Sequence, residues 1–183
     1  MGRTMKLSSL LEMSYFGLTT LLFQRRDPLI GSLILTDRCN LACKHCAVNN
    51  ITGILYPYAQ IRADLQAMFA SGVRILFFYG GEPFLWEEGG RTLKDLVAEA
   101  KEMGFFLVNV VTNGTFALDL PAADLIMVSL DGGKDCHNRI RSDTYDRILG
   151  NIASAPRANI CLYMAINQIN LGDIETVDRK SVV

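Results

Sequence analysis

Three cysteines lie close together in one segment of this sequence. Cys39, Cys43 and Cys46 follow the spacing C-x3-C-x2-C. Thiolates are soft ligands that select iron–sulfur clusters, zinc or copper(I). A structural zinc site usually takes four ligands as two separated pairs, and the two remaining cysteines do not form a second pair. Three thiolates without a nearby fourth predict a metal or cluster that keeps one coordination position open for a ligand.

The cysteine segment directly follows the first of five apolar runs that are typical of β-strands. Helical spacing of apolar residues separates several of these runs, and we expect the last such helix to be capped by Ser142 or Asp143. The connection between the third and fourth runs is short. The expected strands are residues 29–35, 74–79, 106–111, 125–129 and 159–166, and the expected helices centre on residues 61–69, 93–100 and 145–152.

Strands this apolar that alternate with amphipathic helices are buried on both faces, which indicates a parallel sheet. Polar and glycine-rich motifs follow four consecutive strands, as they do at the carboxyl rim of a β/α barrel. We therefore predict an α/β fold: a partial, TIM-like (β/α)6 barrel with parallel strands, truncated after about the fifth strand, plus an N-terminal helix. Cys161 falls inside the fifth strand and is expected in the core.

Three regions are expected along the chain. Residues 1–27 form an N-terminal helical extension, residues 28–177 form the incomplete core, and residues 178–183 match one reading frame of a common sequencing adaptor and are expected to be an artefactual tail. The apolar run 7–23 is at the short limit for a membrane span, so no transmembrane segment is expected. We expect a packing helix, with a peripheral membrane contact as the alternative, because six leucines share one helical face: Leu7, Leu10, Leu11, Leu18, Leu21 and Leu22.

Composition and charge argue against a nucleic-acid partner and against a secreted, disulfide-bonded protein. The net charge of −1 shows no electrostatic footprint for nucleic acid, so no nucleic-acid partner is expected. Five cysteines are an odd number, and three of them crowd into eight residues. That pattern argues against a secreted disulfide framework and predicts a cytoplasmic protein.

A second motif, Gly80-Gly81-Glu82-Pro83, follows the second expected strand. Glycine has no Cβ, so the backbone at Gly80 and Gly81 can approach a ligand closely or adopt positive φ. Backbone carbonyls and Glu82 can then accept hydrogen bonds from an ammonium group, and Pro83 fixes the exit of the turn. The plain alternative is an ordinary turn between a strand and a helix.

Together, the cysteine triplet after one strand and the Gly-Gly-Glu-Pro loop after the next resemble the radical S-adenosylmethionine (radical SAM) superfamily, from about residue 29 to residue 171. The resemblance implies that Cys39, Cys43 and Cys46 hold three irons of a [4Fe–4S] cluster. The fourth iron would chelate the amino and carboxylate groups of S-adenosylmethionine. Reductive cleavage would then give a 5′-deoxyadenosyl radical that abstracts hydrogen from a substrate of unknown identity. An electron donor of the flavodoxin or ferredoxin type is implied as a partner, with a peptide as one candidate substrate.

The resemblance also implies further cofactor contacts. His45 would lie near the adenine, with a solvent-exposed loop histidine as the alternative. Arg141 matches the arginine of the family's His-Asp-x-x-Arg stretch and would approach the carboxylate of S-adenosylmethionine, although here Asn138 replaces the aspartate. A solvated surface arginine is the alternative. Other polar residues after strands would contact the ribose, the carboxylate, the adenosine or the substrate: Thr112, Asn113, Ser129, Asp131 and Asn167. No general base or other catalytic side chain is predicted.

Within the superfamily, the Ser-Leu-Asp-Gly stretch at 129–132 and the His-x-x-x-Arg that follows it resemble the branch with C-terminal auxiliary-cluster (SPASM-type) extensions. That branch includes peptide and protein maturases, with cofactor-biosynthesis cyclases as near neighbours. Two other classes remain as alternatives. A zinc-binding interaction module would hold one zinc per chain, and an iron–sulfur electron carrier would normally use four protein ligands.

Overall fold

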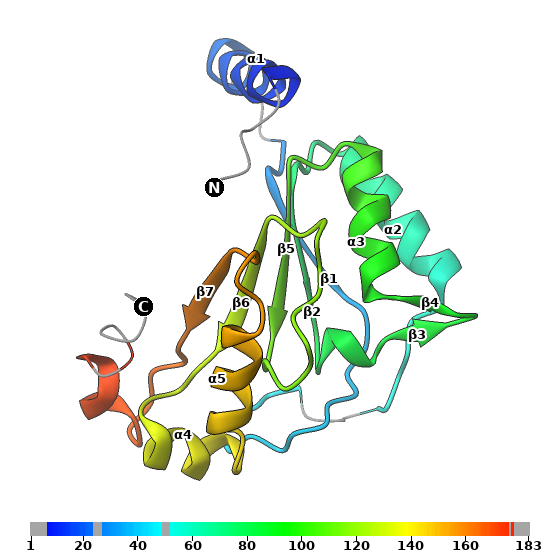
Figure 1. Cartoon of the computed structure of the whole chain (residues 1–183). Helices are drawn as coiled ribbons and strands as arrows, with labels where there is room; N and C mark the ends of the chain where they lie inside the picture. The colour runs from blue at the N-terminus through cyan, green and yellow to red at the C-terminus, as the bar shows by residue number, and fades with distance from the viewer. Residues whose placement is uncertain (1–6, 24–26, 49–51, 176, 178–183) are drawn as a thin grey trace.

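The computed structural model describes residues 7–23, 27–48, 52–175 and 177. Five parallel strands form one sheet in the order β1-β2-β5-β6-β7, so each new strand adds to the same edge (Figure 1). A doubly wound sheet would reverse direction at a switch point. This single direction of growth confirms the partial-barrel prediction. The strands are β1 (Ile30–Ile34), β2 (Ile75–Tyr79), β5 (Leu107–Thr112), β6 (Leu125–Ser129) and β7 (Ile160–Tyr163).

Helices cover one face of the sheet and bury its apolar side chains. In register, Phe78 of β2 pairs with Val110 of β5, which pairs with Ile126 of β6, and all three are buried. They pack in one core with Leu65 and Ile148, which come from two of the covering helices. These helices are α2 (Tyr58–Ala70), α3 (Leu93–Met103) and α5 (Tyr145–Ala153). Sequence periodicity predicted all three.

The opposite face of the sheet, which would line the inside of a barrel, is more open. Ile30, Ile34, Tyr79 and Tyr163 on this face are all exposed. The expectation that Cys161 is a core residue is wrong, because its side chain is exposed on β7. Side chains alternate between the two faces along β7, which places Cys161 on this open face, where it is paired in register with Met127 of the neighbouring strand β6.

The N-terminal helix α1 (Leu7–Phe23) forms as predicted and lies at the end of the sheet where the strands begin (Figure 1). Its predicted packing face is wrong for Leu11, Leu18, Leu21 and Leu22, which are between 56% and 80% exposed. Among the described residues, no helix is long and apolar enough to cross a membrane. The expected artefactual tail, residues 178–183, lies outside the described residues.

Several short elements were not predicted. Helix α4 (Lys134–Arg141) precedes α5, whose N-cap is Thr144 rather than Ser142 or Asp143. A small hairpin joins β3 (Glu87–Glu88) to β4 (Arg91–Thr92) ahead of α3. Two 3-10 turns complete the list, Pro83–Leu85 and Leu171–Asp173.

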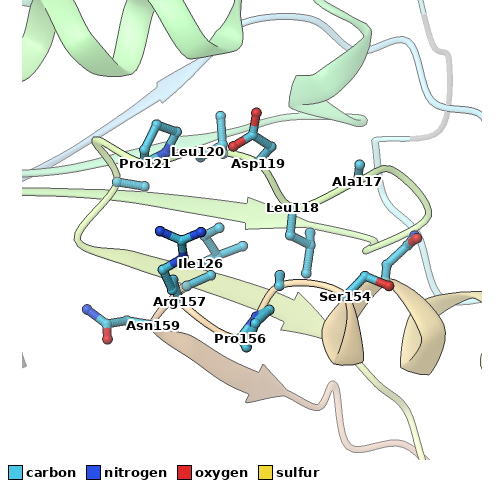
Figure 2. A pocket seen from close by; sticks show the side chains of 14 residues that line it. Ala117, Leu118, Asp119, Leu120, Pro121, Ile126, Ser154, Pro156, Arg157 and Asn159 are labelled. Atoms are coloured by element: carbon cyan, nitrogen blue, oxygen red, sulfur yellow. The ribbon is translucent and has the colours of Figure 1, made fainter. Parts of the chain in front are cut away.

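A groove of about 1040 Å³ lies between the helix-free connection from β5 to β6 and the connection from α5 to β7. Figure 2 shows Leu118 and Pro121 along one side and Pro156 and Arg157 along the other, with Ile126 next to Arg157. None of the residues that were predicted as site residues lines this groove. The polar motifs gather instead at the carboxyl ends of the strands.

Candidate functional site

The cysteine loop is held against the Gly-Gly-Glu-Pro loop by backbone hydrogen bonds. Gly81 N–H donates to Thr36 O at 2.8 Å, and Glu82 N–H donates to Arg38 O at 2.8 Å. A Cβ at Gly81 would lie 2.2 Å from Arg38 O, which no side chain tolerates. Gly80 has a φ of 144°, and a Cβ at this position would likewise lie 2.2 Å from Thr36 O. Both glycines are therefore required for the two loops to touch.

The side chains of the three cysteines of the loop are half-buried for Cys39 and Cys43 and exposed for Cys46. Burial raises the pKa of the Cys43 thiol, while the Arg141 guanidinium acts in the opposite direction. The negative charges of the Cys39 and Cys46 thiolates also raise the pKa of Cys43, so Cys43 lies close enough to both to feel their charges. Burial likewise raises the pKa of Cys39. As a donor set, three soft thiols near a cation fit an iron–sulfur cluster.

In the described part of the chain, no three His, Cys, Asp or Glu side chains stand close enough to hold a metal ion. A single ion needs its ligands around one centre, whereas in a [4Fe–4S] cluster each of the three cysteines binds an iron of its own. Lys44 N–H donates to Ile140 O and Cys46 N–H donates to Cys43 O, both at 3.1 Å, so the backbone of the cysteine loop is held both against residue 140 and within itself.

Glu82 points inward and joins the loop to the end of β5. Its Oε1 accepts the Thr112 hydroxyl at 2.8 Å and the Phe84 N–H at 3.2 Å, and its Oε2 accepts the Asn113 N–H at 2.8 Å. The side chain is completely buried. Burial raises its pKa to about 7, and the hydrogen bonds and Arg141 oppose that rise. A carboxylate offers about four acceptor positions, so three are occupied by the protein itself.

An amide network connects the cysteine loop to the residues after β5. Asn113 Nδ2 donates to Asn40 Oδ1 at 2.8 Å and lies 3.8 Å from Cys39 Sγ. Asn40 Nδ2 in turn donates to Thr115 Oγ1 at 2.8 Å. Thr115 closes the network by donating its hydroxyl to Asn113 Oδ1 at 2.7 Å. Asn113 was predicted as a site residue, but Asn40 and Thr115 were not, because only the folded chain brings them together.

On the other side of the cysteine loop, Asp131 and Arg141 form a buried ion pair. Arg141 Nε donates to Asp131 Oδ2 at 2.5 Å, and the Asp131 side chain is completely shielded from solvent. Arg141 Nη1 lies 3.7 Å from Cys43 Sγ, and its Nη2 lies 3.4 Å from His45 Nε2. His45 is also 3.6 Å from Asp131. The alternative of a solvated Arg141 is wrong, because Arg141 is only 8% exposed.

A buried histidine, His137, fixes the turn that holds Asp131. Asp131 N–H donates to His137 Nδ1 at 3.1 Å, which leaves Nε2 to donate to Thr144 Oγ1 at 3.0 Å. Asn170 Nδ2 donates to the Asp131 backbone carbonyl at 3.4 Å. Sequence analysis gave His137 no role, although it begins the His-x-x-x-Arg stretch on α4. Its spacing of four residues from Arg141 places both side chains on one helix face.

The titration of His137 should be visible in the stability of the chain. Burial lowers its pKa to about 4, helped by the Arg141 charge, against about 6.5 in the unfolded chain. Between these values the unfolded state binds more protons, so stability falls as pH falls from about 6.5 to about 4, by up to about 1.4 kcal/mol per pH unit. Asparagine in place of His137 keeps an acceptor for Asp131 N–H but does not titrate there.

We expect urea unfolding to show a smaller loss of stability between pH 6.5 and 5 in His137→Asn than in the unchanged chain. Glu82 titrates in the opposite direction, but both proteins share it and its effect cancels in the difference. Equal losses in the two proteins would contradict the assignment of a neutral, buried His137.

The remaining predicted residues lie at the same end of the sheet. Ser129 is buried at the end of β6 and pairs in register with Tyr163. Asn167 closes the turn after β7, accepting Ile169 N–H at 2.8 Å and donating to Ala165 O at 3.1 Å. Ala165 N–H donates to Asp131 Oδ1 at 2.9 Å, which links this turn to the ion pair.

Comparison of the sequence with known proteins places this chain in a family. The sequence model of the radical SAM superfamily matches residues 33–180. The chain is 28% identical over 166 residues to the sporulation killing factor maturation protein SkfB of Bacillus subtilis, covering 82% of this chain and 38% of SkfB. It is 35% identical over 132 residues to the GTP 3′,8-cyclase of Parasynechococcus marenigrum, covering 62% of this chain and 37% of the cyclase.

Among solved structures, SuiB of Streptococcus suis bound to its precursor peptide SuiA superposes with a TM-score of 0.67 at 14% identity, covering 95% of this chain and 42% of SuiB. This likeness shows the shared fold. The chain spans less than half the length of each of these relatives.

Proposed function

We propose that Cys39, Cys43 and Cys46 hold a [4Fe–4S] cluster that binds S-adenosylmethionine. The basis of this proposal is that the chain belongs to the radical SAM superfamily. The observation that supports this most directly is that the loop of the three cysteines contacts both the Gly-Gly-Glu-Pro loop and the buried Asp131–Arg141 pair. When bound and reduced, the cluster supplies the electron that cleaves S-adenosylmethionine to methionine and a 5′-deoxyadenosyl radical, which abstracts hydrogen from a substrate.

The residues of the chain bind and orient the cofactor. We assign the methionine ammonium to the Gly80–Pro83 loop, where Glu82 keeps one acceptor position beyond its three internal bonds. Because those bonds pin the carboxylate to Thr112 and Asn113, Glu82 also holds the loop at its distance from the cysteines. This double use explains why a buried carboxylate is tolerated at this position.

We assign the carboxylate and the adenosine of S-adenosylmethionine to residues on the other side of the cysteine loop. We assign the carboxylate to Arg141, whose guanidinium is held rigidly by Asp131 and faces Cys43. His45 lies beside Arg141 at 27% side-chain exposure, which suits a ring that contacts the adenine from the open side. Ser129 and Asn167 are assigned to the ribose and adenosine, on the support of their place at the carboxyl ends of β6 and β7.

Two substrate classes have support. Peptides are favoured by the likeness to SkfB, named a maturation protein, and to SuiB, solved with the peptide SuiA. Cofactor precursors are favoured by the likeness to GTP 3′,8-cyclase. The electron would come from a flavodoxin or ferredoxin type of donor. An odd number of cysteines, five, of which three crowd into eight residues, suits the reducing cytoplasm, where we place the protein.

Anaerobic reconstitution of the 183-residue chain with iron and sulfide tests the proposal against its two alternatives. We expect about four irons per chain, the broad visible absorption of an iron–sulfur cluster, and a change in the electron paramagnetic resonance spectrum of the reduced cluster when S-adenosylmethionine is added. A zinc-binding module would take up one zinc and stay colourless. An electron carrier would be coloured but give the same spectrum with and without S-adenosylmethionine.

A further inference from the structure

N–H groups from distant parts of the sequence face two of the cysteine sulfurs. Asn113 Nδ2 lies 3.8 Å from Cys39 Sγ, and Arg141 Nη1 lies 3.7 Å from Cys43 Sγ. The sequence separations are 74 and 98 residues, so these contacts exist only in the folded barrel. Cys46 Sγ, in contrast, accepts only a local N–H from Val48 at 3.4 Å among the hydrogen bonds of the described residues.

Both distant donors are held in place by bonds to their other atoms. The Asn113 carboxamide oxygen accepts the backbone N–H of Thr115 at 2.9 Å and its hydroxyl at 2.7 Å, which fixes the amide so that its nitrogen points to the cysteine loop. The Arg141 guanidinium is fixed by Asp131 through Nε. Asn113 and Arg141 are 5% and 8% exposed, so water competes little for either donor.

We propose that Asn113 and Arg141 set the reduction potential of the cluster by donating N–H···S hydrogen bonds to Cys39 and Cys43. Hydrogen bonds to ligand sulfurs and nearby positive charge stabilise the reduced cluster, which holds one electron more, over the oxidised one. Both residues therefore make the potential less negative and the cluster easier to reduce. The inference rests on the proposed function, because it requires that these cysteines hold the cluster.

A redox titration of the reconstituted chain, without S-adenosylmethionine and followed by electron paramagnetic resonance, tests the Arg141 contact. We expect Arg141→Gln to shift the midpoint potential to more negative values. Arg141→Lys keeps the positive charge beside Asp131 but loses the planar fork that reaches Cys43. Its shift should have the same sign and a smaller size. The matched control is Arg139→Gln, which removes one positive charge from the exposed face of the same helix and should leave the potential unchanged.

A second pair of variants tests the Asn113 contact. Asn113→Asp keeps the acceptor for Thr115 and replaces the N–H group that faces Cys39 with a carboxylate oxygen, so the potential should again become more negative. Asn138→Asp adds the same charge at a side chain whose oxygen accepts Tyr145 N–H at 3.1 Å and that forms no hydrogen bond to a cysteine sulfur among the described residues. It should leave the potential unchanged.

The outcomes separate this inference from the proposed function. If the unchanged chain takes up no cluster, the proposed function fails, and this inference fails with it. If clusters form in the variants and the potentials of Arg141→Gln and Asn113→Asp equal that of the unchanged chain, only the inference is overturned. If both Arg141 variants keep a normal circular dichroism spectrum but lose the cluster, Arg141 is needed for assembly and the tuning role is likewise overturned.

Discussion

Alanine in place of Cys43 is expected to abolish uptake of the cluster while the chain stays folded. Cys43 is the middle ligand of the three, and the two thiols that remain cannot hold three irons. Its side chain is only half-buried and belongs to a loop outside the core, so its loss should cost the fold little. Iron analysis after anaerobic reconstitution should fall from about four irons per chain to the background level, and the visible absorption of the cluster should disappear.

Cys161→Ala is the matched control for that experiment. It removes one exposed thiol of the same chain that belongs to β7 and not to the cysteine loop. Iron content and absorption should equal those of the unchanged chain. Full iron content in Cys43→Ala, or an equal loss in Cys161→Ala, would contradict the assignment of Cys39, Cys43 and Cys46 as the ligands.

Alanine in place of Asp131 is expected to lower the free energy of unfolding by about 3–5 kcal/mol, because it leaves the Arg141 charge buried without its partner. Asp131 also accepts Ala165 N–H at 2.9 Å, so the turn after β7 loses a bond as well. Urea unfolding measured by circular dichroism gives the difference. The same variant should weaken binding of S-adenosylmethionine, because Arg141 is no longer held beside Cys43.

Asp119→Ala provides the comparison for Asp131. Asp119 forms an ion pair with Lys94 at 2.8 Å, but the Asp119 side chain is 77% exposed. Exposed pairs add little to stability, so its unfolding midpoint should stay close to that of the unchanged chain. An Asp131→Ala chain that unfolds at the same urea concentration as the unchanged chain would refute a stabilising buried pair.

The spacing of apolar residues was sufficient to predict the strands and the main helices, because each of these elements buries a regular row of apolar side chains against neighbouring elements. Helix α4 was missed for the opposite reason. Its buried face consists of His137, Ile140 and Arg141, two of which are polar, so no apolar period marks it. A helix that holds site residues toward the interior is hidden from hydrophobic periodicity. The exposed face of α1 was mispredicted because periodicity cannot say whether a partner element covers an apolar stripe.

The site was predictable where motifs end neighbouring parallel strands, since these ends share one edge of the sheet. Glu82, Asn113 and Asp131 meet the cysteine loop for this reason, through Arg38 O, Cys39 Sγ and His45 respectively. Asn40 and Thr115 were not predictable, because their bond joins residues 75 positions apart and no motif marks either one. The role of Asp131 was also only partly predicted. Its expected contact with a cofactor or substrate stays a prediction, whereas the structure shows that it holds Arg141.

The most direct test of the whole account is the formation of 5′-deoxyadenosine by the reconstituted chain. The chain is incubated anaerobically with S-adenosylmethionine and dithionite, and the products are separated by liquid chromatography and identified by mass. The account predicts 5′-deoxyadenosine and methionine that accumulate with time and are absent when Cys43→Ala replaces the unchanged chain. A chain that holds its full complement of iron, binds S-adenosylmethionine and yet forms no 5′-deoxyadenosine under reduction would contradict the account.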